Sequence, residues 1–255
     1  MACDRSTPRT NPNGTFENND RRGKPRDIGK TLECRSQSTR LVARAAQLRL
    51  GGATAVVWIG AEIVIPLFRA ALELQELCVR NRWPFCFIGG LALQRWGEPR
   101  YTDDVDITLF TDFGAEKQFI DVLLEAFPER MPNAAAFALR ARVLLLRHPN
   151  GIPFDIALGG LPFEARTVER SSLWHVTDGC DLRTCCAEDL IVHKSFAARG
   201  QDWVDVEHII QRQGEKLNTD LIIEELEPLA ALKEQPEILA QLRRLLQTYG
   251  PLGKP

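Results

Sequence analysis

The stretch from Phe87 to Ile107, which reads FIGGLALQRWGEPRYTDDVDI, decides the fold. Its apolar start predicts a short buried strand that ends in two glycines, where a helix begins at once. Glycine lets the backbone approach a ligand closely, and a helix N-terminus offers free N–H groups to an anion. Gly89 and Gly90 therefore predict a phosphate-binding turn.

Two carboxylates close the same stretch. Asp104 and Asp106 are two residues apart in a segment, residues 104–110, whose alternation predicts a strand. Side chains two apart in a strand share a face, so the carboxylates lie together while Val105 and Ile107 face the core. Adjacent carboxylates repel unless a cation lies between them, and Mg²⁺ is a hard cation with oxygen ligands. The pair therefore predicts a divalent-cation site.

A third acid, Asp155, is the lone charge in an apolar strand predicted at residues 152–158. The turn 148–151 joins this strand to another at 143–147 as a hairpin. If the strand lies beside residues 104–110, three carboxylates converge as ligands for two metal ions. Such a metal pair activates an attacking hydroxyl and neutralises a leaving pyrophosphate.

The rest of the pattern predicts an α/β (α+β) protein with a small mixed sheet, flanking helices and a helical C-terminal region. Further strands are expected at 85–88, 173–176 and 182–184, the last two as short edge strands. Helices are expected at 62–82, 91–96, 115–127, 187–198, 202–213, 219–231 and 235–248. Three regions follow from this order: a tail at 1–50, a sheet-containing core at 62–184 and a helical region at 185–250.

Composition excludes several classes of protein. The chain has 255 residues, of which 44% are hydrophobic and 26% charged, which argues against disorder, collagen and coiled coil. Its net charge of −2 argues against a basic nucleic-acid coat. Seven cysteines without a CxxC pair favour a reducing cytosol, so we expect a cytoplasmic protein. The longest apolar run, residues 53–68, is too short for a membrane span.

Residues 1–50 differ from the remainder of the chain. They carry an excess of Lys and Arg and little apolar periodicity, so they cannot bury enough surface to offset their ordering entropy. Because the arginines are interspersed with acids, we expect a disordered tail rather than a nucleic-acid-binding arm. A nucleic-acid-binding role stays open as an alternative.

Taken together, Gly-Gly, a spacer, Asp-x-Asp and a later strand Asp resemble the DNA polymerase β-like nucleotidyltransferase superfamily. The string RYTDDVDI, residues 100–107, is similar to the subgroup that includes the AbiEii toxins of type IV toxin–antitoxin systems. A second segment agrees, namely AEDLIVHK at residues 187–194, followed by Arg199, Asp202 and Asp205.

The resemblance implies a catalytic and metal-binding triad. Asp104 and Asp106 would ligate two Mg²⁺ ions, with Mn²⁺ as an alternative. Asp155 would complete the second site and help to deprotonate the acceptor.

The resemblance also implies six nucleotide-binding residues: Gly89, Gly90, Arg100, Thr102, Lys194 and Asp202. The glycines would hold the triphosphate, and Lys194 would reach a phosphate. Arg100 and Thr102 either touch the substrate or stabilise the turn before Asp104. Asp103 is expected to point away from the carboxylate pair by strand alternation.

The implied activity is nucleotidyl transfer, in which an acceptor hydroxyl attacks the α-phosphate of an NTP and pyrophosphate leaves. The implied partners are the NTP, an RNA, tRNA or protein acceptor, and a cognate antitoxin. Many members have Gly-Ser where this chain has Gly89-Gly90, so a hydroxyl contact to phosphate is missing. Two alternatives remain open: a nucleotide-binding module without turnover, and an antibiotic-type transferase with a small-molecule acceptor.

Overall fold

The computed structural model describes residues 48–50, 53–55 and 61–250. The chain divides into two compact units, residues 1–44 and 45–255, and the described residues all belong to the second. The predicted tail, residues 1–50, lies outside the described residues except for its last three. These form β1 (Leu48–Leu50), which pairs antiparallel with β2 (Ala53–Ala55).

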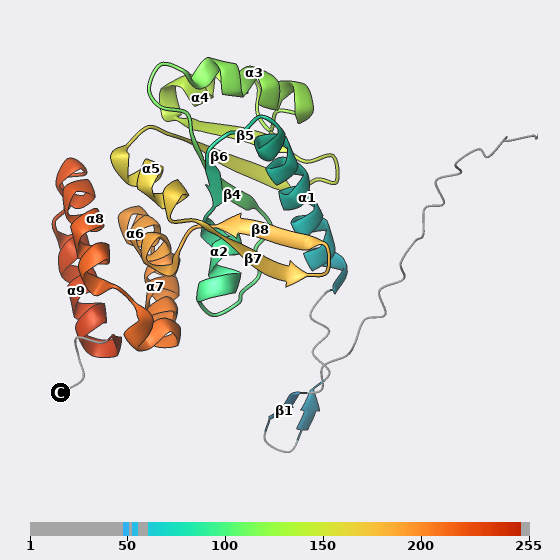
Figure 1. Cartoon of the computed structure of the whole chain (residues 1–255). Helices are drawn as coiled ribbons and strands as arrows, with labels where there is room; N and C mark the ends of the chain where they lie inside the picture. Colours follow the sequence, from blue (N-terminus) through green and yellow to red (C-terminus); the bar gives the residue numbers. More distant parts are fainter. Residues whose placement is uncertain (1–47, 51–52, 56–60, 251–255) are drawn as a thin grey trace, which may run out of the picture. The chain divides into compact units, whose positions relative to one another are not determined.

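A six-stranded mixed sheet with the order β5-β6-β4-β3-β8-β7 organises the second unit (Figure 1). Only two of its pairings are parallel, β4 with β6 and β3 with β8. The strands are β3 (Phe85–Phe87), β4 (Val105–Phe110), β5 (Val143–Arg147), β6 (Pro153–Gly159), β7 (Ser172–Thr177) and β8 (Cys180–Thr184).

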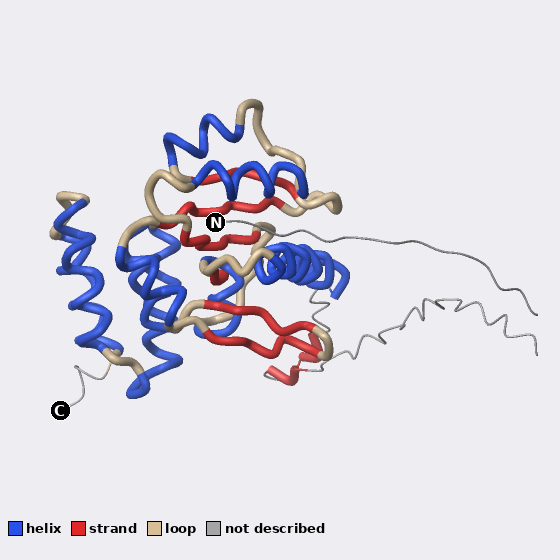
Figure 2. The backbone as a smooth tube through the Cα atoms, turned by 45° about the horizontal axis from the view of Figure 1, so that its top comes forward, coloured by secondary structure: helices blue, strands red, loops and turns tan. Residues whose placement is uncertain are grey.

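Helices flank this sheet and form the C-terminal region, as expected. They are α1 (Ala61–Arg80), α2 (Gly89–Trp96), α3 (Glu116–Ala126), α4 (Ala134–Ala141), α5 (Pro162–Glu169), α6 (Ala187–Ala197), α7 (Gly200–Gln213), α8 (Thr219–Leu232) and α9 (Glu237–Tyr249). The helices α6 to α9 gather beside the sheet at the left of Figures 1 and 2. None of the helices described is long and apolar enough to cross a bilayer.

Apolar side chains pack on both faces of the sheet. One cluster lies between the sheet and α1, α3 and α4, and it contains Phe85 and Phe87. A second cluster contains Cys86 and joins the sheet to α2, α5 and the helices α6 to α9. Strand β3 is therefore apolar on both faces, which is typical of an interior strand covered on each side.

Strand alternation sets the direction of the acidic side chains. On β4, Val105 and Ile107 are buried in the cluster beneath α1, and on β6 Phe154 joins them. Asp106 and Asp155 alternate with these residues, so they point to the opposite face. The prediction that Val105 and Ile107 face the core is confirmed.

Three features differ from the sequence expectations. Strand β8, expected at an edge, lies between β3 and β7, because it pairs in parallel with β3 as well as antiparallel with β7. Helices α4 and α5 were not expected, since each has only eight residues and, unlike α2, neither directly follows a buried strand that ends in two glycines. Helix α5 instead has a local signal: Glu164 accepts hydrogen bonds from the N–H groups of Gly160 and Leu161, which fixes its start.

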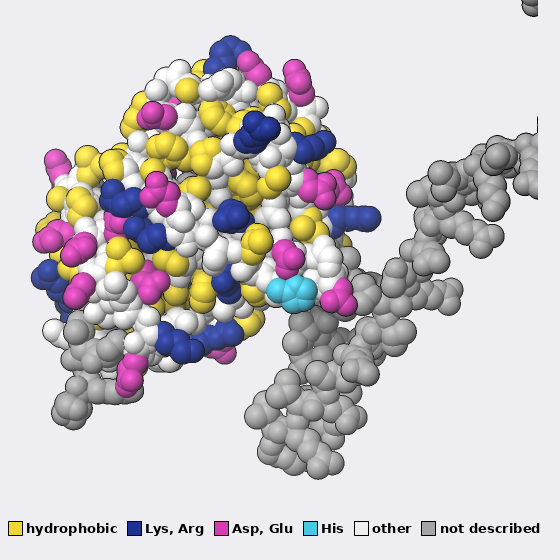
Figure 3. Space-filling model, in the orientation of Figure 1, with side chains coloured by type: hydrophobic (Ala, Val, Ile, Leu, Met, Phe, Trp, Pro, Cys, Tyr) yellow, Lys and Arg dark blue, Asp and Glu magenta, His cyan; other side chains and the backbone are white. Residues whose placement is uncertain are grey.

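The described surface is mixed in charge. On the face shown in Figure 3, Lys and Arg side chains are interspersed with Asp and Glu side chains. This distribution agrees with the net charge of −2. That face therefore presents no broad basic field.

Candidate active site

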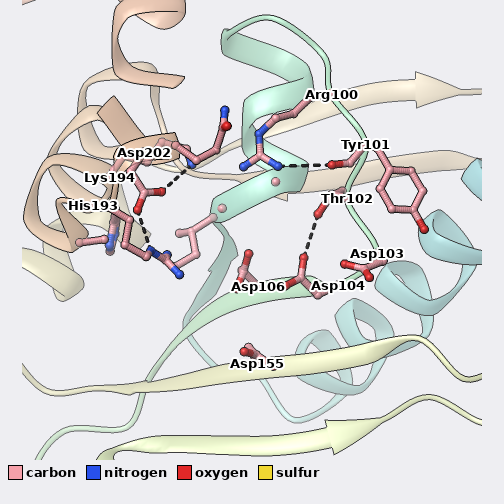
Figure 4. A pocket seen from close by; sticks show the side chains of 16 residues that line it. Arg100, Tyr101, Thr102, Asp103, Asp104, Asp106, Asp155, His193, Lys194 and Asp202 are labelled. Atoms are coloured by element: carbon pink, nitrogen blue, oxygen red, sulfur yellow. Dashed lines mark hydrogen bonds and ion pairs between the residues drawn. The ribbon is translucent and has the colours of Figure 1, made fainter. Parts of the chain in front are cut away.

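A cavity of about 480 Å³ opens between the start of α2, the first residues of strands β4 and β6, and the α6–α7 junction (Figure 4). The nine residues that were assigned catalytic or nucleotide-binding roles line it: Gly89, Gly90, Arg100, Thr102, Asp104, Asp106, Asp155, Lys194 and Asp202. Asp205 of the second motif does not line it. Elements far apart in the chain therefore bring the predicted site residues into one pocket.

The carboxylates converge through strand pairing. Asp106 and Asp155 are direct partners in the parallel pair of β4 and β6, so their side chains lie next to each other on one face. Asp104 precedes β4 and lies beside Asp106 (Figure 4). Burial, followed by the charges of Asp104 and Asp155, raises the pKa of Asp106 to about 6.

The two glycines are required by close packing against this group. Gly89 has a φ of +57°, and a Cβ there would lie 1.9 Å from Oδ2 of Asp106. A Cβ on Gly90 would lie 2.3 Å from Oγ1 of Thr102. Real Cβ atoms do not approach so closely, so Thr102 fills the space that a serine at position 90 would need. The departure from Gly-Ser thus has a local steric cause.

Thr102 also orients the first carboxylate. Its Oγ1 donates a hydrogen bond of 2.8 Å to Oδ1 of Asp104 (Figure 4). The backbone N–H of Gly90 donates to Asp106 and lowers the pKa of that carboxyl against the effect of burial. Asp103 lines the same pocket although alternation would turn it away, because the strand begins only at Val105.

The opposite wall of the pocket is an ion-pair cluster. Nζ of Lys194 lies 2.7 Å from Oδ2 of Asp205 and 3.3 Å from Oδ1 of Asp202. Arg100 binds Asp205 through Nε at 3.0 Å and Nη2 at 2.9 Å, and Arg199 binds Asp202 at 2.7 Å. We call these five residues the α6–α7 clasp.

The clasp is buried on its acidic side. Asp205 and Asp202 are among the buried residues, and so is Lys194. Burial would raise the pKa of Asp205, but the hydrogen bonds from Arg100 and Lys194 outweigh it and lower the pKa below its usual value. Arg199, in contrast, keeps 80% of its side chain exposed at the pocket mouth.

Two further residues lie at or beside the site although the sequence assigned them no role there. Nη2 of Arg130 lies 2.6 Å from Oδ1 of Asp155. His193 of α6 lines the pocket and packs its ring 4.9 Å from that of Phe163. Burial lowers the pKa of His193. Only spatial proximity could reveal Arg130, because residues 128–133 show no periodicity.

The donor set fits a hard divalent cation. Five aspartates line the pocket against three cationic side chains, and each of these cations is already paired with an aspartate. Within the described residues, no group of three or more His, Cys, Asp or Glu is spaced as a complete metal-ligand set. Asp104 and Asp106 nevertheless offer adjacent oxygen donors without a cationic partner in the described part of the chain.

A sequence model of the family described as "Nucleotidyl transferase AbiEii toxin, Type IV TA system" matches residues 79–248, more than half of the chain. No curated protein matches the chain in sequence.

Several solved structures resemble the chain. An antigenic nucleotidyltransferase-like protein from Paracoccidioides brasiliensis is 15% identical, with 72% of this chain and 93% of that chain covered and a TM-score of 0.40. The antibiotic-resistance factor ANT(2'')-Ia is 16% identical, with 71% and 91% covered and a TM-score of 0.38. The lincosamide antibiotic adenylyltransferase LnuA is 12% identical, with 55% and 94% covered and a TM-score of 0.37.

Proposed function

The chain belongs to the AbiEii nucleotidyl transferase family, and we propose that its pocket moves a nucleoside monophosphate from an NTP to a hydroxyl acceptor with the help of Mg²⁺. The observation that supports this proposal is the convergence of Asp104, Asp106 and Asp155 below the glycine turn in one pocket. A helix N-terminus suits the phosphates of a substrate, and the adjacent carboxylates suit a metal ion bound to those phosphates.

The residues for the cation are Asp104 and Asp106, with Asp155 as the third donor. Bound there, Mg²⁺ supplies positive charge that neutralises the phosphates and lowers the pKa of the attacking hydroxyl. Protonation of Asp106 competes with this role, since its pKa is raised to about 6 by burial and its acidic neighbours. Thr102 keeps Asp104 turned toward the pocket.

The glycine turn and the clasp would hold the triphosphate. Gly89 begins α2, so the first N–H groups of that helix face the pocket. A lysine ammonium has three donors, and two of those on Lys194 are used by Asp202 and Asp205. The third is left for a phosphate oxygen, and Arg199 adds an exposed charge at the pocket mouth.

The acceptor side of the reaction needs a proton acceptor. Asp155 faces the pocket from β6, next to Asp106, and it retains 34% of its side-chain exposure. It is therefore placed to take the proton of an acceptor hydroxyl as the oxygen attacks the α-phosphate. The acceptor that family membership favours is a hydroxyl of RNA, tRNA or protein, with toxicity held in check by a cognate antitoxin.

The test is transfer of label from each of the four α-labelled NTPs, with Mg²⁺, to bulk tRNA or to the protein itself. The native chain should label one acceptor class, and Asp106→Asn should reduce the rate by at least about a hundredfold. Asp121→Asn, which alters an exposed aspartate on α3, is the matched control and should keep full activity. Equal labelling by the native chain and Asp106→Asn would refute the proposal.

A further inference from the structure

Asp155, the third carboxylate of the site, forms an ion pair with the side chain of Arg130. Nη2 of Arg130 lies 2.6 Å from Oδ1 of Asp155, and this is the only ion pair of Asp155 within the described residues. No ion pair reaches Asp104 or Asp106 in the same part of the chain. The three acids therefore differ: within the described residues Asp155 forms a direct ion pair, whereas Asp104 and Asp106 feel cations only at longer range.

The backbone fixes where this arginine lies. The Arg130 N–H donates to the carbonyl of Leu145 on β5, and Glu129 forms a bridge with Leu146. Leu145 is in turn the register partner of Asp155 on β6. The guanidinium thus reaches Asp155 across β5, from a segment that does not line the pocket, while Asp155 itself does.

The contact is a charge contact rather than a directed hydrogen bond. Oδ1 of Asp155 is buried and has no hydrogen-bond donor of acceptable geometry among the described residues. The side chains keep exposures of 24% for Arg130 and 34% for Asp155, so both remain in contact with solvent. A partner held mainly by charge competes with any other cation for the same carboxylate.

We infer that Arg130 is a positioning residue that acts as the built-in counter-cation of Asp155 and weakens divalent-cation binding at that carboxylate. This inference rests on the proposed function of the site. The first cation then binds at Asp104 and Asp106, which form no direct ion pair in the described part of the chain. Asp155 can ligate a cation with its full negative charge only when the Arg130 guanidinium moves away from it. The second cation site, which includes Asp155, is therefore the weaker one.

Binding of Mn²⁺ alone, without nucleotide, tests this directly in the full chain by electron paramagnetic resonance of free Mn²⁺. Arg130→Gln should bind Mn²⁺ at least roughly fivefold more tightly, or bind a second ion, because a competing charge has been removed. Arg147→Gln is the matched control, since Arg147 is exposed on neighbouring β5 and, among the described residues, its side chain bonds only to the carbonyl of Gly151. It should leave the affinity unchanged.

Two more variants separate charge competition from a structural role. Arg130→Lys keeps the charge and should retain the native affinity. In an Asp155→Asn background, Arg130→Gln should have no further effect on Mn²⁺ binding. Circular dichroism confirms that each variant is folded. If Arg130→Gln is not folded, Arg130→Met, which also removes the charge but keeps an unbranched side chain, replaces it and should show the same tighter Mn²⁺ binding.

The outcomes distinguish this inference from the proposed function. Unchanged or weaker Mn²⁺ binding by Arg130→Gln would overturn the inference, because the arginine would then support the carboxylate instead of competing for it. Absence of Mn²⁺ binding to the native chain, with no difference from Asp104→Asn, would instead contradict the cation site and the proposed function with it.

Discussion

Thr102 connects the glycine turn to the carboxylates at the scale of single residues. Its side chain fills the space beside Gly90, and its hydroxyl holds Asp104. A hydrogen bond to a charged group contributes about 1.5–3 kcal/mol. One side chain therefore explains both why position 90 is glycine and how the first carboxylate is aimed.

Thr102→Val removes that hydrogen bond at nearly constant shape. We expect kcat/KM for nucleotidyl transfer to fall by about tenfold or more, because a loss of about 1.4 kcal/mol corresponds to a factor of ten. Steady-state kinetics with a fixed acceptor measures the effect. Full activity in this variant would show that Asp104 is oriented without the hydroxyl.

Thr108→Val is the contrasting change, on strand β4 that follows Thr102 in the chain. Oγ1 of Thr108 is buried and has no hydrogen-bond partner among the described residues. Replacing an unsatisfied hydroxyl by a methyl group should leave stability unchanged or raise it by up to about 1 kcal/mol. Urea unfolding gives the value, and a loss of more than about 1 kcal/mol would mean that the hydroxyl has a partner.

Gly90→Ser tests the steric account of the departure from Gly-Ser. The new Cβ would meet Thr102 at 2.3 Å, so that side chain must move away from Asp104. We expect a loss of about 1–3 kcal/mol in unfolding free energy together with reduced activity. Adding Thr102→Gly should recover part of the stability. A fully stable and active single variant would argue against this packing.

At the scale of helices and strands, the α6–α7 clasp connects the helical region to the loop before β4. Lys194 on α6 and the two aspartates on α7 join the helices, and Arg100 ties the loop before β4 to the same group. The clasp therefore sets the distance between the helical region and the carboxylates. Removal of one buried partner leaves an uncompensated charge.

Asp205→Ala should lower the free energy of unfolding by about 3 kcal/mol, since Lys194 and Arg100 both lose a partner. Asp121→Ala, at an exposed pair between neighbouring turns of α3, should cost at most about 0.5 kcal/mol. Chemical denaturation of both variants makes the comparison. Equal losses would contradict a stabilising role for the clasp.

Acid should remove the contribution of Asp205. Its pKa lies below the ordinary value of 3.8, so the folded state favours the ionised carboxylate. The stabilisation is therefore present above that value and is lost as the pH falls through the lower folded-state pKa. The stability difference between the native chain and Asp205→Ala should shrink below about pH 4. A constant difference down to pH 2 would contradict this account.

At the scale of the whole molecule, local patterns predicted the strands that carry the site and the helices of the C-terminal region. Alternation placed Asp106 on the pocket face, and the glycines gave the start of α2 within two residues. These features depend on neighbours along the chain. The resemblance then placed Lys194 and Asp202, which α6 and α7 bring to the pocket.

Other features depend on contacts between distant segments and could not be predicted. Arg130 meets Asp155 only because residues 128–130 run beside β5, which lies beside β6. The parallel pairing of β8 with β3 is likewise set by tertiary packing and not by its own short sequence. Helix α4 has eight residues, too few to reveal a period.

The central claim is that a nucleoside monophosphate is transferred, and parallel reactions with α-labelled and γ-labelled NTP test it most directly. The account predicts label on the acceptor from the α position, none from the γ position, and release of γ-labelled pyrophosphate in equal amount. Label on the acceptor from the γ position would mean phosphoryl transfer and would contradict the account.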